Sequence, residues 1–150
     1  MMSKKKVAVI TGSGQGIGKA LAERLAKEEF SIVLSDVNEQ ILIETEKEFK
    51  NNGFEVTSFV GNVTNPDDQE ALVQHAVDTF GSVDVFINNA GVEGQVAPLT
   101  HVDPKAVDFT LDVNVKGTIY GIKAAANQMK KQGTGGKIIN ACSIAGQEGF

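Results

Sequence analysis

Short apolar runs alternate with longer amphipathic segments along this chain. In several runs, such as 7–10 and 32–34, every position is apolar, a pattern typical of strands that are buried on both faces of a parallel sheet. The pattern predicts five strands, at residues 6–11, 31–36, 55–60, 83–88 and 137–142.

The segments between the strands repeat apolar residues at the period of an α-helix, in stripes of the kind that helices turn toward a core. These stripes are Ile17, Ala20, Leu21 and Leu25; Leu72, Val73, Ala76, Val77 and Phe80; and Val115, Ile119, Ile122, Ala126 and Met129. Helix ends are marked as well. Asn65 and Asp103 each precede a proline, as N-caps do, and Gly53 and Gly81 stand where helix C-termini favour glycine.

Strands that alternate with helices build βαβ units with right-handed crossovers, and therefore a parallel sheet. The sequence predicts an α/β fold with a doubly wound parallel sheet, the Rossmann fold, with five strands. The 150 residues suit a single domain over 1–150, and no repeat or linker divides them.

Composition narrows the class of protein. Hydrophobic residues make up 41% and charged residues 22%, as in ordinary soluble proteins. The net charge of −5 argues against nucleic acid or an anionic membrane as the main partner. No apolar run approaches the ~20 residues of a membrane span, and the run after the N-terminal lysines is too short for an export signal. The single cysteine permits no internal disulfide, and the expected location is the cytoplasm.

A glycine-rich turn joins the first predicted strand to the first helix. Its sequence, Thr-Gly-Ser-Gly-Gln-Gly-Ile-Gly at 11–18, fits T-G-x-x-x-G-x-G, whereas the spacing G-x-G-x-x-G would need glycine at Ile17. Glycines let the backbone approach a pyrophosphate closely, and the helix N-terminus offers unpaired N–H groups. The expected cofactor contacts are Gly12, Gln15, Gly16, Ile17 and Gly18. The alternative is a glycine-rich surface turn.

Asp36 closes the second predicted strand. A carboxylate about 20 residues beyond such a turn can accept hydrogen bonds from the adenosine ribose hydroxyls. Two like charges about 4 Å apart repel by roughly 4 kcal/mol at an effective dielectric of about 20. No lysine or arginine at 13, 15, 37 or 38 would offset the charge of a 2′-phosphate, so NAD is expected rather than NADP. The alternative is that Asp36 is the N-cap of the next helix.

Four further motifs follow in order. They are Asn-Val-Thr at 62–64, Asn-Asn-Ala-Gly at 88–91, Asn-Val-x-Gly at 114–117 and Asn-Ala-Cys-Ser-x-Ala-Gly at 140–146. Together with the glycine turn and Asp36, they make the whole chain resemble the short-chain dehydrogenase/reductase family, whose members transfer hydride between a nicotinamide and a carbonyl or alcohol.

The resemblance implies cofactor contacts beyond the turn. Asn62 and Val63 would hold the adenine, and the ribose side would be lined by Asn89, Ala90 and Gly91. Asn62 departs from the aspartate that is common in the family, and its amide oxygen is expected to accept from the adenine amino group. Asparagine and glycine at a strand end also turn a chain for structural reasons alone, and both roles can hold together.

The resemblance also implies two catalytic positions. Ser143 matches the family serine that holds the substrate carbonyl. Asn114 matches the asparagine that kinks its helix and seats a water for proton relay, and the alternative for Asn114 is a helix cap. Cys142 takes the place of the first serine of the usual pair and is expected to be a small buried apolar residue.

The family acid is a tyrosine with a lysine four residues later, and the sequence is expected to stop before this Tyr-x-x-x-Lys segment, at Phe150. Tyr120 has its lysine at the third following position and precedes the serine, so it is expected to pack on its helix. His75 and His101 lack metal-ligand spacing and are expected at the surface, so no metal is predicted.

Two features predict assembly. Ile138 and Ile139 would lie on an open edge strand, which invites pairing with another chain, and the helix at 114–132 would lack a partner. A 150-residue product is expected to be marginally soluble or to assemble. Because members of the family often form dimers or tetramers, the full-length form is expected to be a homo-oligomer.

Within the family, the segments 14–19 and 135–143 are similar to those of bacterial diacetyl (acetoin) reductases, also called 2,3-butanediol dehydrogenases. This resemblance implies a small carbonyl or alcohol substrate. The alternatives are another short-chain alcohol dehydrogenase, of the sugar or 3-oxoacyl reductase type, and a non-catalytic NAD-binding fragment.

Overall fold

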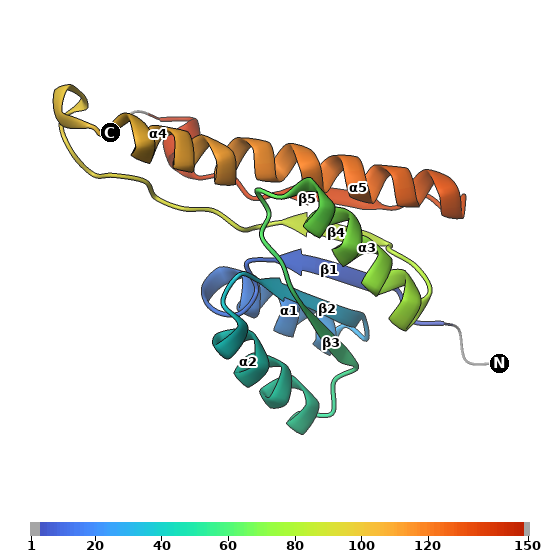
Figure 1. The fold of residues 1–150 in the computed structure, drawn as a ribbon. Coiled ribbons are helices and arrows are strands. Elements are labelled where there is room, and N and C mark those ends of the chain that lie inside the picture. The colour runs from blue at the N-terminus through green and yellow to red at the C-terminus, as the bar shows by residue number, and fades with distance from the viewer. Residues whose placement is uncertain (1–3, 149–150) are drawn as a thin grey trace.

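The computed structural model describes residues 4–148, so Phe150 lies outside the described part. The strands form one parallel sheet with the order β3-β2-β1-β4-β5 (Figure 1). They are β1 (Val7–Thr11), β2 (Ser31–Asp36), β3 (Val56–Val60), β4 (Val85–Asn88) and β5 (Lys137–Asn140). Each lies within its predicted range, which confirms the doubly wound α/β fold.

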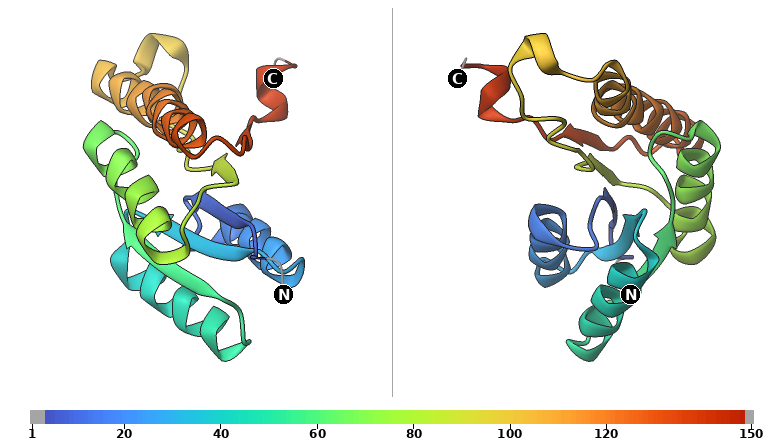
Figure 2. Two further views of the ribbon diagram at one scale, coloured as in Figure 1. Left: turned by 90° about the vertical axis from the view of Figure 1, so that its right-hand side faces the viewer. Right: turned by 60° about the vertical axis from the view of Figure 1, so that its left-hand side comes forward.

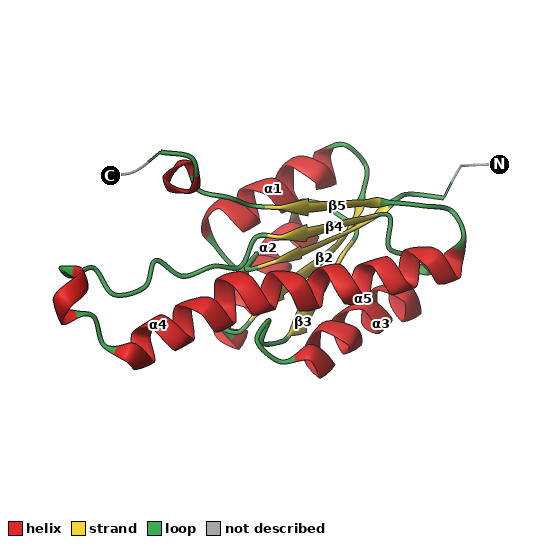
Figure 3. Ribbon diagram, turned by 90° about the horizontal axis from the view of Figure 1, so that it is seen from above, coloured by secondary structure: helices red, strands yellow, loops and turns green. Residues whose placement is uncertain are grey.

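Helices cover both faces of the sheet. The bounds are α1 (Gly16–Lys27), α2 (Glu39–Asn51), α3 (Pro66–Phe80), α4 (Pro104–Leu111) and α5 (Gly117–Gln132), with short turns η1 (Leu99–His101), η2 (Asp112–Lys116) and η3 (Ile144–Gly146). Helices α1 and α2 pack on one face, and α3 and α5 on the other (Figures 2 and 3). Because η2 is a single π-helical turn, α4 and α5 run on as one bent rod.

Alternate residues of the central strands point to opposite faces of the sheet and contribute to two separate hydrophobic cores, one on each face. Val9 pairs with Val33 on one side and with Phe86 on the other, and these three residues are fully buried beneath α3 and α5. Ile10 and Leu34 point to the opposite face and pack with α1 and α2. Burial of both strand faces explains why these runs carry apolar residues without alternation.

The predicted helix ends are confirmed. The Asn65 side chain accepts a hydrogen bond from the Asp67 backbone N–H at 3.1 Å, and Asp103 accepts from Lys105 N–H at 2.9 Å. Each cap is followed by proline at the first helical turn. Gly81 ends α3 with φ of +89°, a backbone conformation that favours glycine.

The apolar stripes predict the buried face of α3, but they predict the buried faces of α1 and α5 only in part. In α3 the predicted Leu72, Val73 and Ala76 are buried. In α1 the buried residues are Gly18, Ala22 and Ala26, and in α5 they are Gly117, Gly121, Ala124, Ala125 and Met129. Ile17 is 75% exposed and Ile119 is 55% exposed, so both stripes are wrong at these positions. Met129 of α5 is buried as predicted, and Leu25 of α1 packs against the core.

The reason is that α1 and α5 approach the sheet too closely for large side chains. A Cβ added at Gly18 would overlap the Gly12 carbonyl oxygen, and one added at Gly121 would overlap the Asn88 side chain. Small residues therefore face the strands at these points, and Ile17 and Ile119 turn outward.

Strand β5 lies at one edge of the sheet, as predicted. Ile138 packs against the core on one face, whereas Ile139 is 48% exposed. None of the helices between residues 4 and 148 is both long enough and apolar enough to span a membrane.

Candidate functional site

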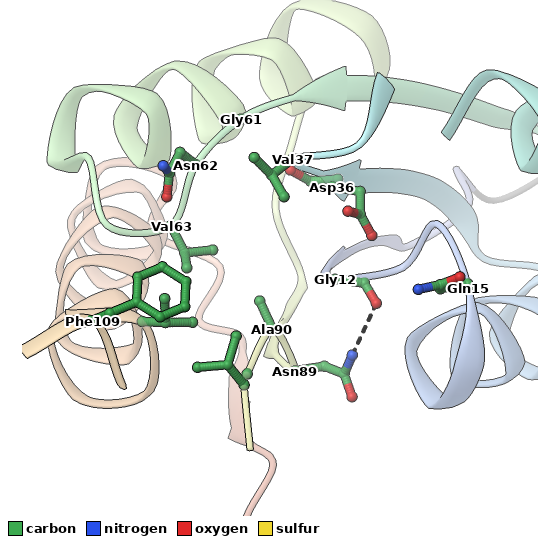
Figure 4. A pocket seen from close by; sticks show the side chains of 14 residues that line it. Gly12, Gln15, Asp36, Val37, Gly61, Asn62, Val63, Asn89, Ala90 and Phe109 are labelled. Carbon is green, nitrogen blue, oxygen red and sulfur yellow. Dashed lines mark hydrogen bonds between the residues drawn. The ribbon is translucent and has the colours of Figure 1, made fainter. Parts of the chain in front are cut away.

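The carboxyl ends of the parallel strands surround a pocket of about 330 Å³ (Figure 4). Eight of the predicted cofactor residues line it: Gly12, Gln15, Asp36, Asn62, Val63, Asn89, Ala90 and Gly91. These residues come from the ends of four strands and the loops that follow them: Asp36 is the last residue of β2, and the others lie after β1, β3 and β4. Ligands of open α/β sheets bind in this position, where the strand order reverses and the loops diverge.

The turn after β1 forms one wall of the pocket, and its glycines are required by close contacts. Gly12 has φ of +62°, and a Cβ there would lie 2.8 Å from the Cα of Ala90. A Cβ at Gly14 would lie 2.9 Å from a carboxylate oxygen of Asp36. Side chains at these positions would therefore push apart the segments that enclose the pocket.

The N-terminus of α1 opens toward this wall without a side-chain cap. Gln15 occupies the N-cap position and makes no capping hydrogen bond, and the first turn carries no acidic residue. Backbone N–H groups and the positive end of the helix dipole are thus left to a ligand. Gly16, Ile17 and Gly18 form this first turn and lie next to the pocket lining rather than in it. The arrangement suits an anionic group such as a phosphate.

Hydrogen bonds from Thr11 and Asn89 join the ends of β1 and β4 beneath the pocket. The buried Thr11 hydroxyl accepts from the backbone N–H groups of Asn89 and Ala90, both at 3.1 Å. In return the Asn89 side-chain amide donates to the Thr11 carbonyl oxygen at 3.1 Å. It also donates to the Gly12 carbonyl oxygen at 3.1 Å (Figure 4). The Asn-Asn-Ala-Gly segment therefore has a structural role, as the sequence allowed, and also lines the pocket.

Asp36 holds the turn and keeps acceptor capacity for a ligand. Its carboxylate accepts from Gly14 N–H at 3.0 Å and from Asn38 N–H at 3.1 Å. A carboxylate has about four acceptor positions, so two remain for hydroxyl groups. Helix α2 is capped by Asn38, which accepts from Ile41 N–H at 3.2 Å, so the alternative role of Asp36 as that N-cap is wrong.

Asn62 begins the loop after β3, and its side-chain oxygen is engaged within the chain. The Oδ1 atom accepts from Thr64 N–H at 3.0 Å and from the Thr64 hydroxyl at 2.8 Å. Both lone pairs of the amide oxygen are thus used, which the sequence did not reveal. Binding of adenine at Asn62 and Val63 stays a prediction.

Sequence reasoning missed six residues of the pocket lining: Ser35, Val37, Gly61, Val92, Phe109 and Val113. Val37 follows Asp36 at the end of β2, and Gly61 follows β3. Because ligands of open α/β sheets bind at the carboxyl ends of the strands, both residues could have been predicted to line the pocket. Phe109 and Val113 come from α4 and the π-helical turn. Their spacing of four residues is the signal that could have indicated a shared helix face.

Asn114 lies inside the π-helical turn and clamps the loop after β4. Its amide nitrogen donates to the Val92 carbonyl oxygen, and its oxygen accepts from Val92 N–H, both at 2.8 Å. The predicted irregularity of the helix at this residue is confirmed. The alternative of a helix cap is wrong, because Asn114 stands in the middle of the continuous α4–α5 rod. Its water-seating role stays a prediction.

Ser143 follows β5 and caps the short turn η3, where its hydroxyl oxygen accepts from Ala145 N–H at 3.2 Å. The structure places Ser143 at the carboxyl end of the sheet but not in the pocket lining. Its neighbour Cys142 is exposed, so the prediction of a buried cysteine is wrong. The reason is that β5 is the edge strand, and no described element covers its end.

The groups with displaced pKa values lie outside the pocket. Burial would raise the pKa of the Glu46 carboxyl, but hydrogen bonds from Lys50 and Ser58 outweigh it and hold the pKa below its ordinary value. In the π-helical turn, a hydrogen bond to Asp112 raises the pKa of Lys116. These groups stabilise α2 and η2 rather than supply an acid or base to the pocket.

The remaining candidate side chains lie apart from the pocket. His75 is half-buried rather than at the surface, because its Nε2 lies 3.0 Å from the Thr57 hydroxyl and its ring packs beside Phe59. His101 is exposed, and Tyr120 is half-buried on α5. In the described part of the chain, His, Cys, Asp and Glu form no group that could hold a metal ion.

The parallel sheet, the glycine turn and the strand-end pocket define a doubly wound α/β protein of the Rossmann class. Residues 6–150 match the family described as short chain dehydrogenase. The chain belongs to this family.

Named relatives agree with this assignment. Over 145 residues the chain is 52% identical to a diacetyl reductase [(S)-acetoin forming] of Staphylococcus epidermidis, covering 97% of this chain and 56% of the relative. A short-chain dehydrogenase/reductase of Burkholderia phymatum, solved with NAD, superposes with a TM-score of 0.94 at 35% identity, covering 98% of this chain and 52% of that one.

An NAD⁺-bound xylitol dehydrogenase superposes with a TM-score of 0.93 at 36% identity, covering 98% of this chain and 56% of that one. The chain thus spans about half the length of the relatives it matches.

Proposed function

We propose that this chain is the nucleotide-binding part of an NAD(H)-dependent oxidoreductase that interconverts a small carbonyl compound and its alcohol. One observation carries the proposal: a single pocket connects the uncapped N-terminus of α1 with the carboxylate of Asp36. These are the two groups that a dinucleotide needs, one for its pyrophosphate and one for its ribose hydroxyls. The NAD complex of the Burkholderia phymatum relative supports the same cofactor.

In this proposal the cofactor contacts divide by chemistry. The pyrophosphate lies at the turn formed by Gly12, Gln15, Gly16, Ile17 and Gly18; the adenosine lies at Asp36, Asn62 and Val63; and the remaining ribose side lies at Asn89, Ala90 and Gly91. No lysine or arginine belongs to the pocket lining in residues 4–148, so a 2′-phosphate beside Asp36 would be repelled. This favours NAD over NADP. When bound, the cofactor supplies or accepts the hydride.

Two residues of the chain are assigned to the substrate side. The Ser143 hydroxyl is proposed to donate a hydrogen bond to the substrate oxygen, because it stands exposed at the carboxyl end of β5. Asn114 is proposed to seat the water of a proton relay, and its clamp on Val92 fixes the adjacent loop. Tyr120 lies on α5 and does not line the pocket. We therefore expect the proton donor to be the tyrosine of a Tyr-x-x-x-Lys segment outside the described residues.

For the substrate we propose diacetyl and acetoin. The support is the 52% identity to the Staphylococcus epidermidis diacetyl reductase over nearly the whole chain. Sugar alcohols are the second candidate, because the xylitol dehydrogenase is similar in fold and 36% identical in sequence.

The test is made on the full-length protein. We expect NADH to bind more tightly than NADPH, and Asp36→Ala to lower NADH affinity at least about tenfold through loss of charge-assisted hydrogen bonds to the ribose. Turnover is then compared for diacetyl, acetoin, xylitol and a 3-oxoacyl thioester. Binding of NADH without any turnover would support the non-catalytic alternative, and equal affinity for NADPH would contradict the role of Asp36.

We also propose that the full-length protein is a homo-oligomer that uses the outer face of the α4–α5 rod. Leu111, Val115 and Ile119 are exposed there at intervals of four residues, which makes a continuous apolar stripe. We expect Ile119→Asp to reduce the molar mass in light scattering, whereas Ile43→Asp, at an equally exposed position on α2, leaves it unchanged. An unchanged mass in the Ile119 variant would contradict this proposal.

A further inference from the structure

The pocket has a phosphate end and a base end. In a dinucleotide the ribose separates the phosphate from the base, so a ligand with its phosphate at α1 and its ribose at Asp36 must place its base beyond Asp36. That end of the pocket is lined by Val37, Gly61, Asn62 and Val63 (Figure 4). The two valines offer apolar surface to a flat ring, and Asn62 is the one side chain of this set with hydrogen-bonding groups.

The orientation of the Asn62 amide is fixed by the chain itself. A backbone N–H can only donate, so the atom that faces Thr64 N–H at 3.0 Å must be the amide oxygen. The Thr64 hydroxyl donates to the same oxygen at 2.8 Å. The Asn62 amide nitrogen has no acceptor within residues 4–148, and its two N–H groups are therefore the side-chain polar groups of this end that are left for a ligand.

Resting on the proposed NAD site, we infer that Asn62 presents hydrogen-bond donors rather than an acceptor to the base, and thereby weakens selection for the 6-amino group of adenine. A purine with an amino group at position 6 offers a donor there, and one with a 6-oxo group offers an acceptor. The Asn62 amide N–H groups match the 6-oxo group. An aspartate at 62 would match the amino group and repel the oxygen.

The experiment compares NAD with nicotinamide hypoxanthine dinucleotide, which differs in carrying oxygen in place of the 6-amino group and a proton on the adjacent ring nitrogen. Dissociation constants for both are measured by calorimetry with the full-length wild type and with Asn62→Asp. Aspartate can accept both hydrogen bonds from Thr64, so the loop keeps its structure, and a thermal melt checks this. Because both ligands carry the same phosphates and nicotinamide, the ratio of their dissociation constants cancels any general effect of the added charge.

We expect the preference for NAD over the hypoxanthine dinucleotide to be at least about tenfold greater in Asn62→Asp than in the wild type, from one charge-assisted hydrogen bond gained and one repulsion introduced. Asn38→Asp is the matched control. It makes the same substitution at the N-cap of α2, where aspartate also caps, and Asn38 does not line the pocket. Its ratio should equal that of the wild type.

An unchanged ratio in Asn62→Asp, with NAD still bound, would overturn the inference and leave the proposed function standing. Failure of the wild type to bind either dinucleotide would overturn the proposed function, and the inference with it.

Discussion

Replacing Thr11 with valine removes one hydroxyl group and keeps the branched shape that fits the buried end of β1. The hydroxyl is the acceptor for two backbone N–H groups, those of Asn89 and Ala90, at 3.1 Å each. It also donates weakly to the Ile87 carbonyl oxygen at 3.4 Å. No other group in the described chain replaces it, so the substitution leaves two donors without a protein acceptor.

Each buried donor that loses its partner costs about 1–3 kcal/mol. Asn89 and Ala90 are half-buried beside the pocket, where water can reach part of the exposed surface, so the two costs do not add fully. We therefore expect Thr11→Val to lower the free energy of unfolding by about 2–4 kcal/mol.

The assay is urea unfolding followed by far-ultraviolet circular dichroism on the full-length protein. The midpoint should fall while the slope stays constant, because the surface exposed on unfolding is unchanged. Thr79→Val is the matched control, since Thr79 is exposed on α3, and its effect should stay within about 0.5 kcal/mol. A loss below about 0.5 kcal/mol for Thr11→Val would refute the view that this hydroxyl joins β1 to β4.

Two further predictions concern α1 and α2. Gly18→Ala forces a methyl group onto the Gly12 carbonyl oxygen, so we expect the free energy of unfolding to fall by about 1–3 kcal/mol. We also expect weaker NADH binding in calorimetry. Unchanged affinity would contradict the placement of α1 against the turn. Glu46 has a lowered pKa in the folded state, so its stabilisation is present above its ordinary pKa and is lost as the pH falls through the folded value. In urea titrations Glu46→Gln should therefore be less stable than wild type by about 0.5–1 kcal/mol at neutral pH and equal to it in strong acid. A constant difference across the acid range would contradict this assignment.

The strands could be predicted from the sequence because burial on both faces leaves a short apolar run without alternation at the centre of the buried strands. Strand β1 carries this signal at residues 7–10 and strand β2 at residues 32–34, and the bounds of both strands differ from the prediction by at most one residue. The caps at Asn65 and Asp103 were predictable for a related reason. Their chemistry is local, and it depends on the next two residues rather than on the fold.

The buried faces of α1 and α5 could be predicted only in part from apolar stripes. A helix that closely approaches other atoms needs small residues at the contact. Gly18 therefore faces the Gly12 carbonyl oxygen and Gly121 faces the Asn88 side chain, while Ile17 and Ile119 face outward. A stripe of large apolar residues reflects side-chain size and hydrophobicity together. Such a stripe therefore fails to indicate the buried face of a helix at positions where the helix lies very close to the sheet and only a small residue fits.

The candidate site was predictable where it follows strand ends and unpredictable where it depends on distant packing. Gly12, Asp36 and Asn89 stand directly at the ends of their strands, and they meet in one pocket. Phe109 reaches the same pocket from α4, whose position depends on the long loop after β4 and on the Asn114 clamp. No local pattern around Phe109 encodes that path.

The two ends of the pocket are built from different material. The phosphate end is made of backbone atoms at van der Waals limits, so nearly every substitution at Gly12 or Gly18 must move the chain itself. The base end is made of exposed side chains such as Val37 and Asn62. Val37 can change without moving the chain, and Asn62 can change to any residue that still accepts the hydrogen bonds from Thr64. Natural sequence variation should therefore be much lower at the phosphate end of the pocket than at the base end a few ångströms away. We expect related sequences to change their preference for the base and for ribose modifications by single substitutions, while the residues that contact the phosphates stay the same.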